Sequence, residues 1–230
     1  MTIANDTHRS VSIACIVFFL AACLTLVGCL GYSEQSSAPW ANSLILNSES
    51  EHLVEVVVPT NVVNIAHQDI DDLVSDLKTA GAGHFENIEW NGTEGVDHTV
   101  SITLKESDRA WWGAKSEELV ADVCGKFETL GRNLGQDGYR IQISADYDEV
   151  DYYYNLEADP STQIAPYFYA CEYYCIMRQL FASDEIGKYS MHSTIYNSDT
   201  GKFVTDSHTS NEVVSNGLSY TTEDWERSYS

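Results

Sequence analysis

Positive charge is scarce in this 230-residue sequence, which has 12 lysines and arginines against 35 aspartates and glutamates, for a net charge of −23. A chain of this charge repels nucleic acid and anionic lipid head groups, and it has no basic stripe that would attract either. We therefore expect no nucleic-acid partner. The acidity is typical of a soluble surface, and it would also favour bound cations.

The short motifs that mark common enzymes are also missing. The sequence has no G-x-S-x-G elbow, no H-E-x-x-H pair and no glycine-rich loop for a phosphate or a dinucleotide. The stretch SDTGK at 198–202 ends like a phosphate loop, but it lacks the first glycine and the hydroxyl residue after the lysine, so it predicts a hairpin turn. We expect no cofactor and no enzymatic activity.

An apolar run near the start, VSIACIVFFLAACLTLV at 11–27, carries no charge. It is long for the core of a signal peptide and short for a membrane span, which needs about 20 residues. Before it, Arg9 is the only basic side chain and is partly offset by Asp6. We interpret 1–28 as the signal peptide of a lipoprotein. The alternatives are an ordinary cleaved signal peptide, with Cys29 present by chance, and an uncleaved N-terminal anchor.

The tetrapeptide Leu26-Val27-Gly28-Cys29 at the end of this run resembles the lipobox of bacterial lipoproteins. The resemblance covers about the first 29 residues. It implies that the Cys29 thiol receives a diacylglyceryl group and that the Gly28–Cys29 bond is then cut. Two acyl chains anchor a protein stably, at about 0.8 kcal/mol per buried CH₂. The resemblance thus implies a lipid-anchored protein on the outer side of the cell membrane.

Three cysteines remain beyond the lipobox: Cys124, Cys171 and Cys175. An odd number allows at most one internal bridge, so the domain is not a disulfide-built scaffold. A bridge between residues four apart on a helix is geometrically awkward, which favours Cys124 with one of the other two, Cys171 first. A zinc site from Cys171, Cys175 and His192 is an alternative, against a simple role as small core residues.

Composition divides the rest of the chain into three parts. Residues 29–50 are small and polar and predict a tether, 51–210 predict a single folded domain, and 211–230 predict a polar tail that is either loose or docked. In chain order the domain pattern predicts a strand at 53–58, a helix at 70–80, a hairpin over 84–104, a helix over 107–134 capped by Ser107, a strand pair at 139–144 and 150–157, a helix at 161–180 and a hairpin over 188–209.

Short turns between most neighbouring strands indicate α+β architecture, with a largely antiparallel sheet and about three helices packed on one face. The helix at 161–180 is apolar over so wide an arc that we expect it to be heavily buried.

The stretch ADYDEVDYYYNLEAD at 145–159 is the main candidate for a ligand site. Asp146, Asp148 and Asp151 carry oxygen donors of the kind that calcium prefers. However, Val150 stands where a helix–loop–helix calcium loop needs a donor, so a solvated acidic turn is the alternative. On a strand Tyr153 would point outward with Asp151, where an aromatic ring beside carboxylates suits recognition of a sugar or a peptide.

A fainter resemblance covers the domain loosely. A valine-rich strand that ends in proline, Val54–Pro59, and a closing hairpin with an Asp-Thr-Gly turn, Asp199–Gly201, are similar to small uncharacterised lipoproteins of Gram-positive bacteria. That group implies no catalytic residues.

Three functions fit these observations. The first is a non-enzymatic binding or accessory module of the cell envelope, whose partner is an envelope protein or a glycan. The second is an envelope hydrolase with paired carboxylates such as Glu89 and Asp151, which would need a specific separation. The third is a structural subunit of an envelope complex. We favour the first, because no catalytic motif accompanies the predicted lipid anchor.

Overall fold

The computed structural model describes residues 52–66, 69–93, 97–155, 161–182, 186–213 and 218–230. The predicted signal peptide, Cys29 and the predicted tether at 29–50 lie outside these ranges. The described residues all belong to one unit, Glu49–Ser230. Its elements are β1 (Leu53–Val58), α2 (Thr60–Ile65), α3 (Ile70–Ala80), β2 (Asn87–Thr93), β3 (Asp97–Lys105), α4 (Glu106–Asn133), β4 (Arg140–Ile143), β5 (Glu149–Tyr154), α5 (Ser161–Ala182), β6 (Ser190–Asn197), β7 (Phe203–Ser210) and α6 (Thr222–Arg227).

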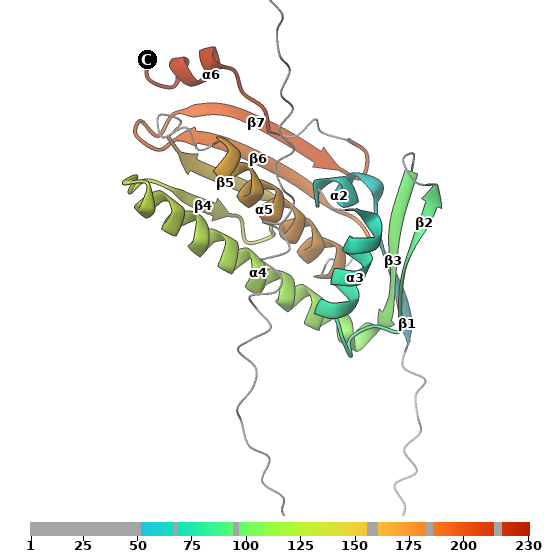
Figure 1. Cartoon of the computed structure of the whole chain (residues 1–230). Coiled ribbons are helices and arrows are strands. Elements are labelled where there is room, and N and C mark those ends of the chain that lie inside the picture. The colour runs from blue at the N-terminus through green and yellow to red at the C-terminus, as the bar shows by residue number, and fades with distance from the viewer. Residues whose placement is uncertain (1–51, 67–68, 94–96, 156–160, 183–185, 214–217) are drawn as a thin grey trace, which may run out of the picture. The chain divides into compact units, whose positions relative to one another are not determined.

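The α+β class is confirmed, and the strands divide between two sheets (Figure 1). One sheet has the order β1-β3-β2 and is antiparallel throughout. The other has the order β4-β5-β6-β7, and its central pair, β5 and β6, is parallel. The parallel pair arises because α5 connects β5 to β6, and a helix crossover returns the chain in the same direction. The three predicted hairpins are present as antiparallel pairs.

Helix α5 is the centre of the core, as its wide apolar arc predicts. Seven consecutive residues, Cys171–Met177, are buried. The helix packs against α4 and β6 and also reaches α2 and β1 of the other sheet. Because it has neighbours on nearly every side, it cannot present the polar face that a surface helix has.

Helices α4 and α5 lie antiparallel, as their contacts show. Trp112 near the start of α4 stacks on Phe181 near the end of α5, with ring centroids 5.1 Å apart. Further along, Phe127 of α4 meets Phe168 of α5 at 6.3 Å. The predicted cap was wrong: α4 begins at Glu106 with Lys105 as its N-cap, no side chain caps it, and Ser107 lies within the first turn.

The smaller sheet is covered by α2 and α3, which pack on β3 and β2. Helix α3 is capped at its N-terminus by Asp69, whose carboxylate accepts a hydrogen bond from the Asp71 N–H at 2.9 Å. On β3, Val100, Ile102 and Leu104 are fully buried on one side of the strand, as the alternation of side chains along a strand requires. The short helix α2 was not predicted, because six residues are too few to show a periodic pattern.

The C-terminal segment is docked on the domain. Helix α6 carries a capping box in which Thr221 and Asp224 satisfy each other's backbone N–H groups. Trp225 is 4 % exposed, and its ring lies 5.2 Å from the ring of Tyr154. Of the two alternatives for 211–230, the loose tail is therefore wrong for the described part of this segment, and the fold continues to its last residues.

Within the described ranges, no helix combines the length and the apolar character needed to cross a bilayer.

Candidate functional site

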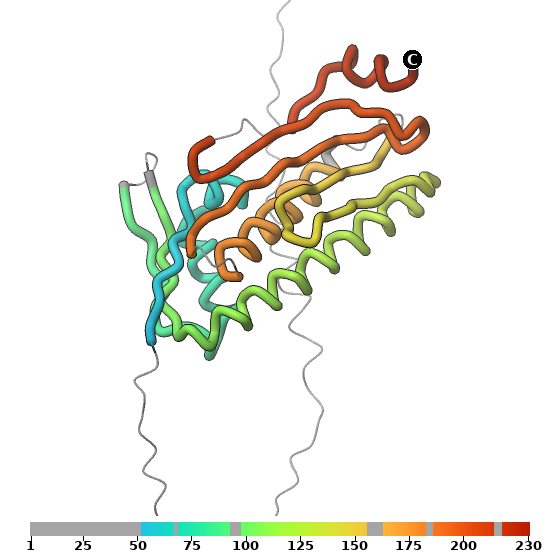
Figure 2. Tube along the Cα trace, turned by 180° about the vertical axis from the view of Figure 1, so that it is seen from behind, coloured from blue at the N-terminus to red at the C-terminus, as the bar shows by residue number. Residues whose placement is uncertain are grey.

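The face of the β4–β7 sheet that points away from α4 and α5 is the candidate site. Figure 2 shows the strands of this sheet in front of α5, with α4 running along the edge next to β4. Strand alternation decides which side chains lie there, because Val150, Tyr152 and Tyr154 of β5 are buried toward the helices. We call this surface the outer face; its residues are Arg140, Gln142, Glu149, Asp151, Tyr153, His192, Thr194, Tyr196, Phe203, Asp206 and His208.

A row of one arginine and three aromatic side chains, which we call the aromatic row, crosses all four strands of the outer face. Arg140 of β4 places its guanidinium 3.6 Å from the centre of the Tyr153 ring. On the other side, Tyr196 of β6 stacks on Tyr153 with centroids 5.0 Å apart and planes 15° apart. Phe203 of β7 meets Tyr196 edge-on at 6.5 Å and is 54 % exposed. Cross-strand pairs of this kind stabilise a sheet and give it a rigid surface.

This row changes the expected use of Tyr153. The sequence predicts an outward ring that a sugar could stack on, and the ring does lie on the outer face. However, Arg140 lies over one side of the ring and Tyr196 is stacked on the other, since they come from the two flanking strands. Tyr153 therefore offers its edge and its hydroxyl to a partner, and stacking of a sugar would require Arg140 to move.

Acidic groups surround the aromatic row. Partial burial and the neighbouring Glu149 carboxylate raise the pKa of Asp151 above its usual range, against the opposing effects of His192 and Thr194. Partial burial and then the field of Asp151 raise the pKa of the Tyr196 hydroxyl. Burial is the larger cause of both shifts, and the neighbouring carboxylates add to it. Because three carboxylates, those of Glu149, Asp151 and Asp206, face one arginine, the outer face is suited to neutral or cationic groups and not to anions.

Two histidine pairs lie beside the acids. His192 Nε2 is 3.0 Å from Asp206 Oδ2, and His208 Nε2 is 3.1 Å from Ser190 Oγ. A Ser–His–Asp triad needs one imidazole that contacts both the hydroxyl and the carboxylate. Here the two contacts belong to different histidines, so these four residues are not arranged as a triad.

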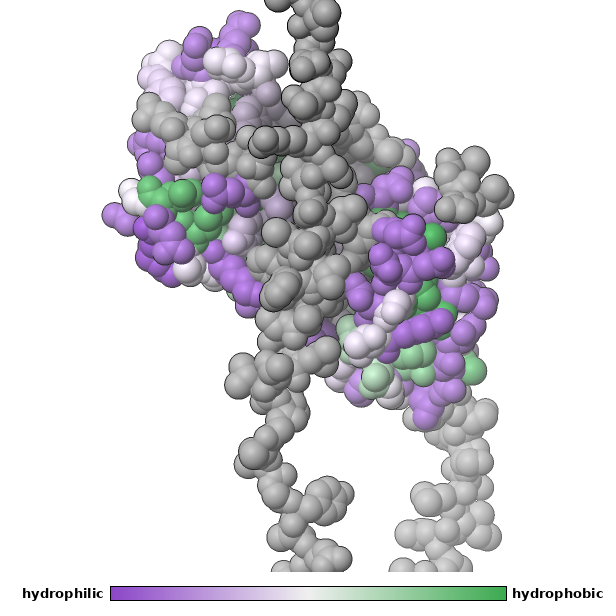
Figure 3. Space-filling view, in the orientation of Figure 1, coloured by the Kyte–Doolittle hydropathy of each residue, from purple (hydrophilic) through white to green (hydrophobic). Residues whose placement is uncertain are grey.

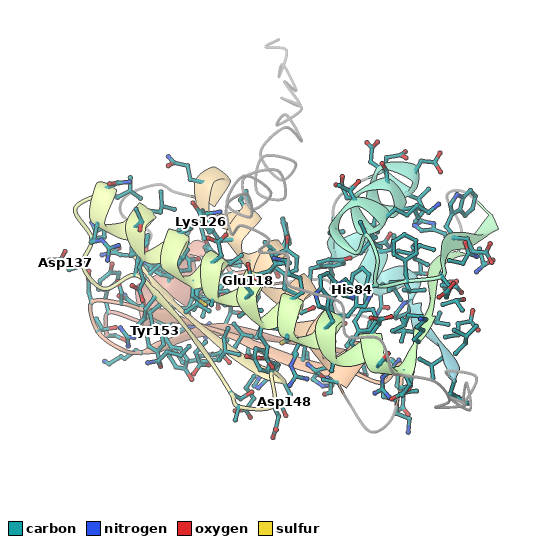
Figure 4. All side chains as sticks on the ribbon, turned by 90° about the horizontal axis from the view of Figure 1, so that it is seen from below. His84, Glu118, Lys126, Asp137, Asp148 and Tyr153 are labelled. Carbon is teal, nitrogen blue, oxygen red and sulfur yellow. The ribbon has the colours of Figure 1, made fainter. Side chains whose placement is uncertain are left out.

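The predicted acidic residues do not converge on a metal. Asp148 lies at the β4–β5 turn, where its carboxylate accepts a hydrogen bond from Ser144 Oγ at 2.6 Å, while Asp151 lies along β5. Figure 4 shows Asp148 at the tip of the turn and Tyr153 further along the strand. Asp146 lies in the same turn. Among the described residues, no group of three histidine, cysteine or acidic side chains is placed to hold a metal ion.

The three described cysteines are free thiols, so the predicted bridge between Cys124 and Cys171 is not formed in the structure. The two thiols are nevertheless neighbours, because Cys171 is hydrogen-bonded to Cys124 across the α4–α5 interface. The alternative zinc site is wrong: Cys171 and Cys175 are fully buried, whereas His192 lies on the outer face. Cys171 and Cys175 contribute to the core as small apolar residues.

The carboxylate pair considered for a hydrolase is not assembled on one surface. Glu89 lies on β2 of the three-stranded sheet, and Asp151 lies on β5 of the other.

Sequence reasoning missed three members of the aromatic row: Arg140, Tyr196 and Phe203. A signal was present for two of them, since Tyr196 and Phe203 alternate with the buried residues Ile195 and Val204 in the predicted closing hairpin. The pairing of this hairpin with β5 could not be predicted from the sequence, because a short turn indicates only an antiparallel neighbour and β5 and β6 are parallel.

Two other surfaces are less suited to binding than the outer face. At a distance from Tyr153, His84 Nδ1 contacts Asp108 Oδ1 at 2.9 Å, and the His84 ring stacks on Trp111 (Figure 4). On the helix side, a shallow groove follows α4 past Gly125 and Leu130. That side is largely hydrophilic, with hydrophobic residues gathered where α4 ends (Figure 3). Neither surface combines an extended aromatic row with a charged surround.

No protein-family model, no curated protein and no solved structure matches this chain. The geometry of the site is thus the basis for a functional assignment.

Proposed function

We propose that the protein is a non-enzymatic accessory module of the cell envelope, held at the membrane by a lipid on Cys29, and that its outer face binds a partner protein. The observation that carries this proposal is the row Arg140–Tyr153–Tyr196–Phe203 on a sheet face that no described helix covers. Tyrosine and arginine are enriched among residues that dominate binding energy at protein interfaces. An extended row across the strands of a sheet fits a protein better than a small molecule, which prefers a concave pocket.

The charge around the row defines the chemistry of the partner. Glu149, Asp151 and Asp206 make the outer face acidic. A partner with basic residues would be attracted by this face, and a partner with acidic residues would be repelled. We therefore propose a basic surface patch on an envelope protein, with Phe203 as the exposed apolar contact.

Anchoring by lipid brings this face close to partners in the same membrane. Confinement of two proteins to one surface raises their effective concentration, so a weak interface of modest area is sufficient. Membrane retention of the full chain should be lost in Cys29→Ser, as measured by fractionation and by mass spectrometry of the N-terminal peptide. The matched control is Cys124→Ser, which changes a free thiol of the folded domain in the same way. This variant should remain in the membrane.

Site-specific photo-crosslinking tests the binding face. A photoreactive phenylalanine at position 203 should give one discrete adduct in native membranes, and the same group at Glu118 on the exposed helix side should not. Adduct yield from position 203 should fall about tenfold in Tyr196→Ala and should decrease as salt screens the acidic face.

The controls separate partner classes. Glu149→Lys should weaken the adduct, whereas Glu118→Lys should leave it unchanged. Equal adducts from both positions would contradict the proposed face. If soluble chitin oligosaccharides compete with formation of the adduct, the partner of the outer face is a glycan and not a protein.

A further inference from the structure

A pocket of about 170 Å³ lies on the opposite side of the β4–β7 sheet, between the start of α5, the end of β5 and the segment that leads to α6. Its walls are mainly aromatic, with Tyr154, Phe168, Tyr169 and Tyr220 among the lining residues. Tyr154 lies 5.6 Å from Phe168 and 6.3 Å from Tyr220, centroid to centroid, with planes inclined by 57° and 55°. At these angles the rings are inclined to one another and are not stacked face to face.

One ionisable carboxyl group, that of Glu172, lines this aromatic pocket. Glu172 is 8 % exposed, and in the described part of the chain no cation forms an ion pair with it. The one basic residue of α5, Arg178, pairs with Glu117 of α4 instead. Burial raises the pKa of Glu172 to about 7, against the opposing effect of the neighbouring Ser193 hydroxyl.

An unpaired carboxylate among aromatic rings lowers the stability of the folded protein, because no partner offsets the loss of its hydration. A buried charge is normally paired, because transfer from water into an apolar site is unfavourable. The same combination of groups is complementary to one class of ligand: ring faces attract a cation through their quadrupoles, and the carboxylate neutralises its charge.

We infer that this pocket binds a small organic cation, an alkylammonium group held between the tyrosine and phenylalanine rings and the Glu172 carboxylate. The size agrees, since a cavity of about 150 Å³ is enough to hold benzene. A choline-sized cation therefore fits, and a drug-sized molecule does not. The pocket lies on the helix side of β5 and the outer face on the other side, so this site is independent of the proposed protein partner.

Thermal unfolding of the full chain at pH 8 tests the inference, with two probes of matched shape. Choline carries the positive charge, and 3,3-dimethylbutan-1-ol is its neutral counterpart. Choline at tenfold excess over Kd should raise Tm by a few degrees, and its affinity should exceed that of the neutral alcohol at least tenfold. Equal shifts from both probes, or none from either, would overturn the inference without any variant being needed.

Variants then assign the residues. Glu172→Gln should lower the affinity for choline at least tenfold, and Glu118→Gln, an exposed carboxylate on α4, should not change it. Tyr220→Leu keeps the charge and removes one ring, and should lower the affinity several-fold. An unchanged affinity in Glu172→Gln would refute the role of the carboxylate.

A last comparison identifies the source of the cation. If glycerophosphocholine binds more tightly than choline, the natural ligand is the head group of a lipid. If it binds more weakly, the natural ligand is a free organic cation. Either result supports an alkylammonium site.

Discussion

Tyr153 and Tyr196 stack on adjacent parallel strands, with ring centroids 5.0 Å apart and Arg140 over the far side of Tyr153. The pair joins two strands that are separated in sequence by the whole of α5. It therefore links the two ends of the crossover on the surface that we propose as the binding face.

The first prediction concerns this pair. In a double-mutant cycle, Tyr153→Ala and Tyr196→Ala should show a coupling of about 0.5–1 kcal/mol in the free energy of unfolding, because cross-strand aromatic pairs contribute energy of this size. Chemical denaturation measures it. Tyr153→Ala combined with the remote Glu223→Ala should be additive, and an additive tyrosine pair would show that the stacking has no energetic effect.

The second prediction concerns close packing at the end of α4. A Cβ at Gly131 would collide with the Tyr139 side chain and approach the Gln136 carbonyl oxygen to 2.8 Å. Gly131→Ala should therefore destabilise the protein by about 1–3 kcal/mol. Gly125, two turns earlier, has open space around its Cβ position, so Gly125→Ala should stabilise the helix by about 0.5–1 kcal/mol. The same sign for both variants in urea unfolding would contradict this packing.

The third prediction concerns pH. Burial raises the pKa of Glu172 to about 7 in the folded state, above the value of about 4.3 for an unfolded chain. Between these values the folded protein binds more protons than the unfolded one, so stability contributed by the protonated group is present below pH 4 and is lost as pH rises toward 7. The loss amounts to about 3 kcal/mol.

Glu172→Gln mimics the protonated form and should remove this part of the pH dependence. It should be more stable than the wild type at pH 8 and similar at pH 4, as measured by urea unfolding across pH. A variant that is less stable than the wild type at pH 8 would show that the ionised carboxylate has a favourable partner.

The fourth prediction concerns the C-terminal segment. Trp225 is buried against Tyr154 and Tyr220, so Trp225→Ala should cost about 3–5 kcal/mol. The adjacent Glu226 is exposed, and Glu226→Ala should change stability by less than about 0.5 kcal/mol. If the two variants have equal thermal midpoints, the segment does not contribute to the folded core.

The fifth prediction concerns the thiols. The interaction with Cys171 and burial raise the pKa of Cys124, and the thiolate is the reactive form of cysteine. Cys171 and Cys175 are fully buried, so reagents cannot reach them. All three thiols should resist alkylation by iodoacetamide in the native protein at pH 8 and react fully after denaturation. Peptide mass spectrometry assigns each site, and rapid native labelling of Cys171 would contradict its burial.

Much of the local structure is determined by the sequence itself. Spacing of apolar residues fixed the helix at 70–80, because Ile70, Leu73, Val74 and Leu77 can share one buried side only in a helix. Alternation fixed the sides of β3 and β5, and it placed Tyr153 and Asp151 on the opposite side from Tyr152. The burial of α5 followed from its lack of a polar face.

Tertiary structure alone decided the rest. Local pattern does not state which strands pair across a helix, so the division into two sheets and the parallel β5–β6 pair appear only when α5 packs against both. The parallel pair covers one side of the Tyr153 ring with Tyr196. Docking of the C-terminal segment brings Tyr220 into a pocket with Glu172, 48 residues away in the chain. Periodicity arises from the geometry of one segment, whereas contacts between distant segments depend on how their surfaces fit.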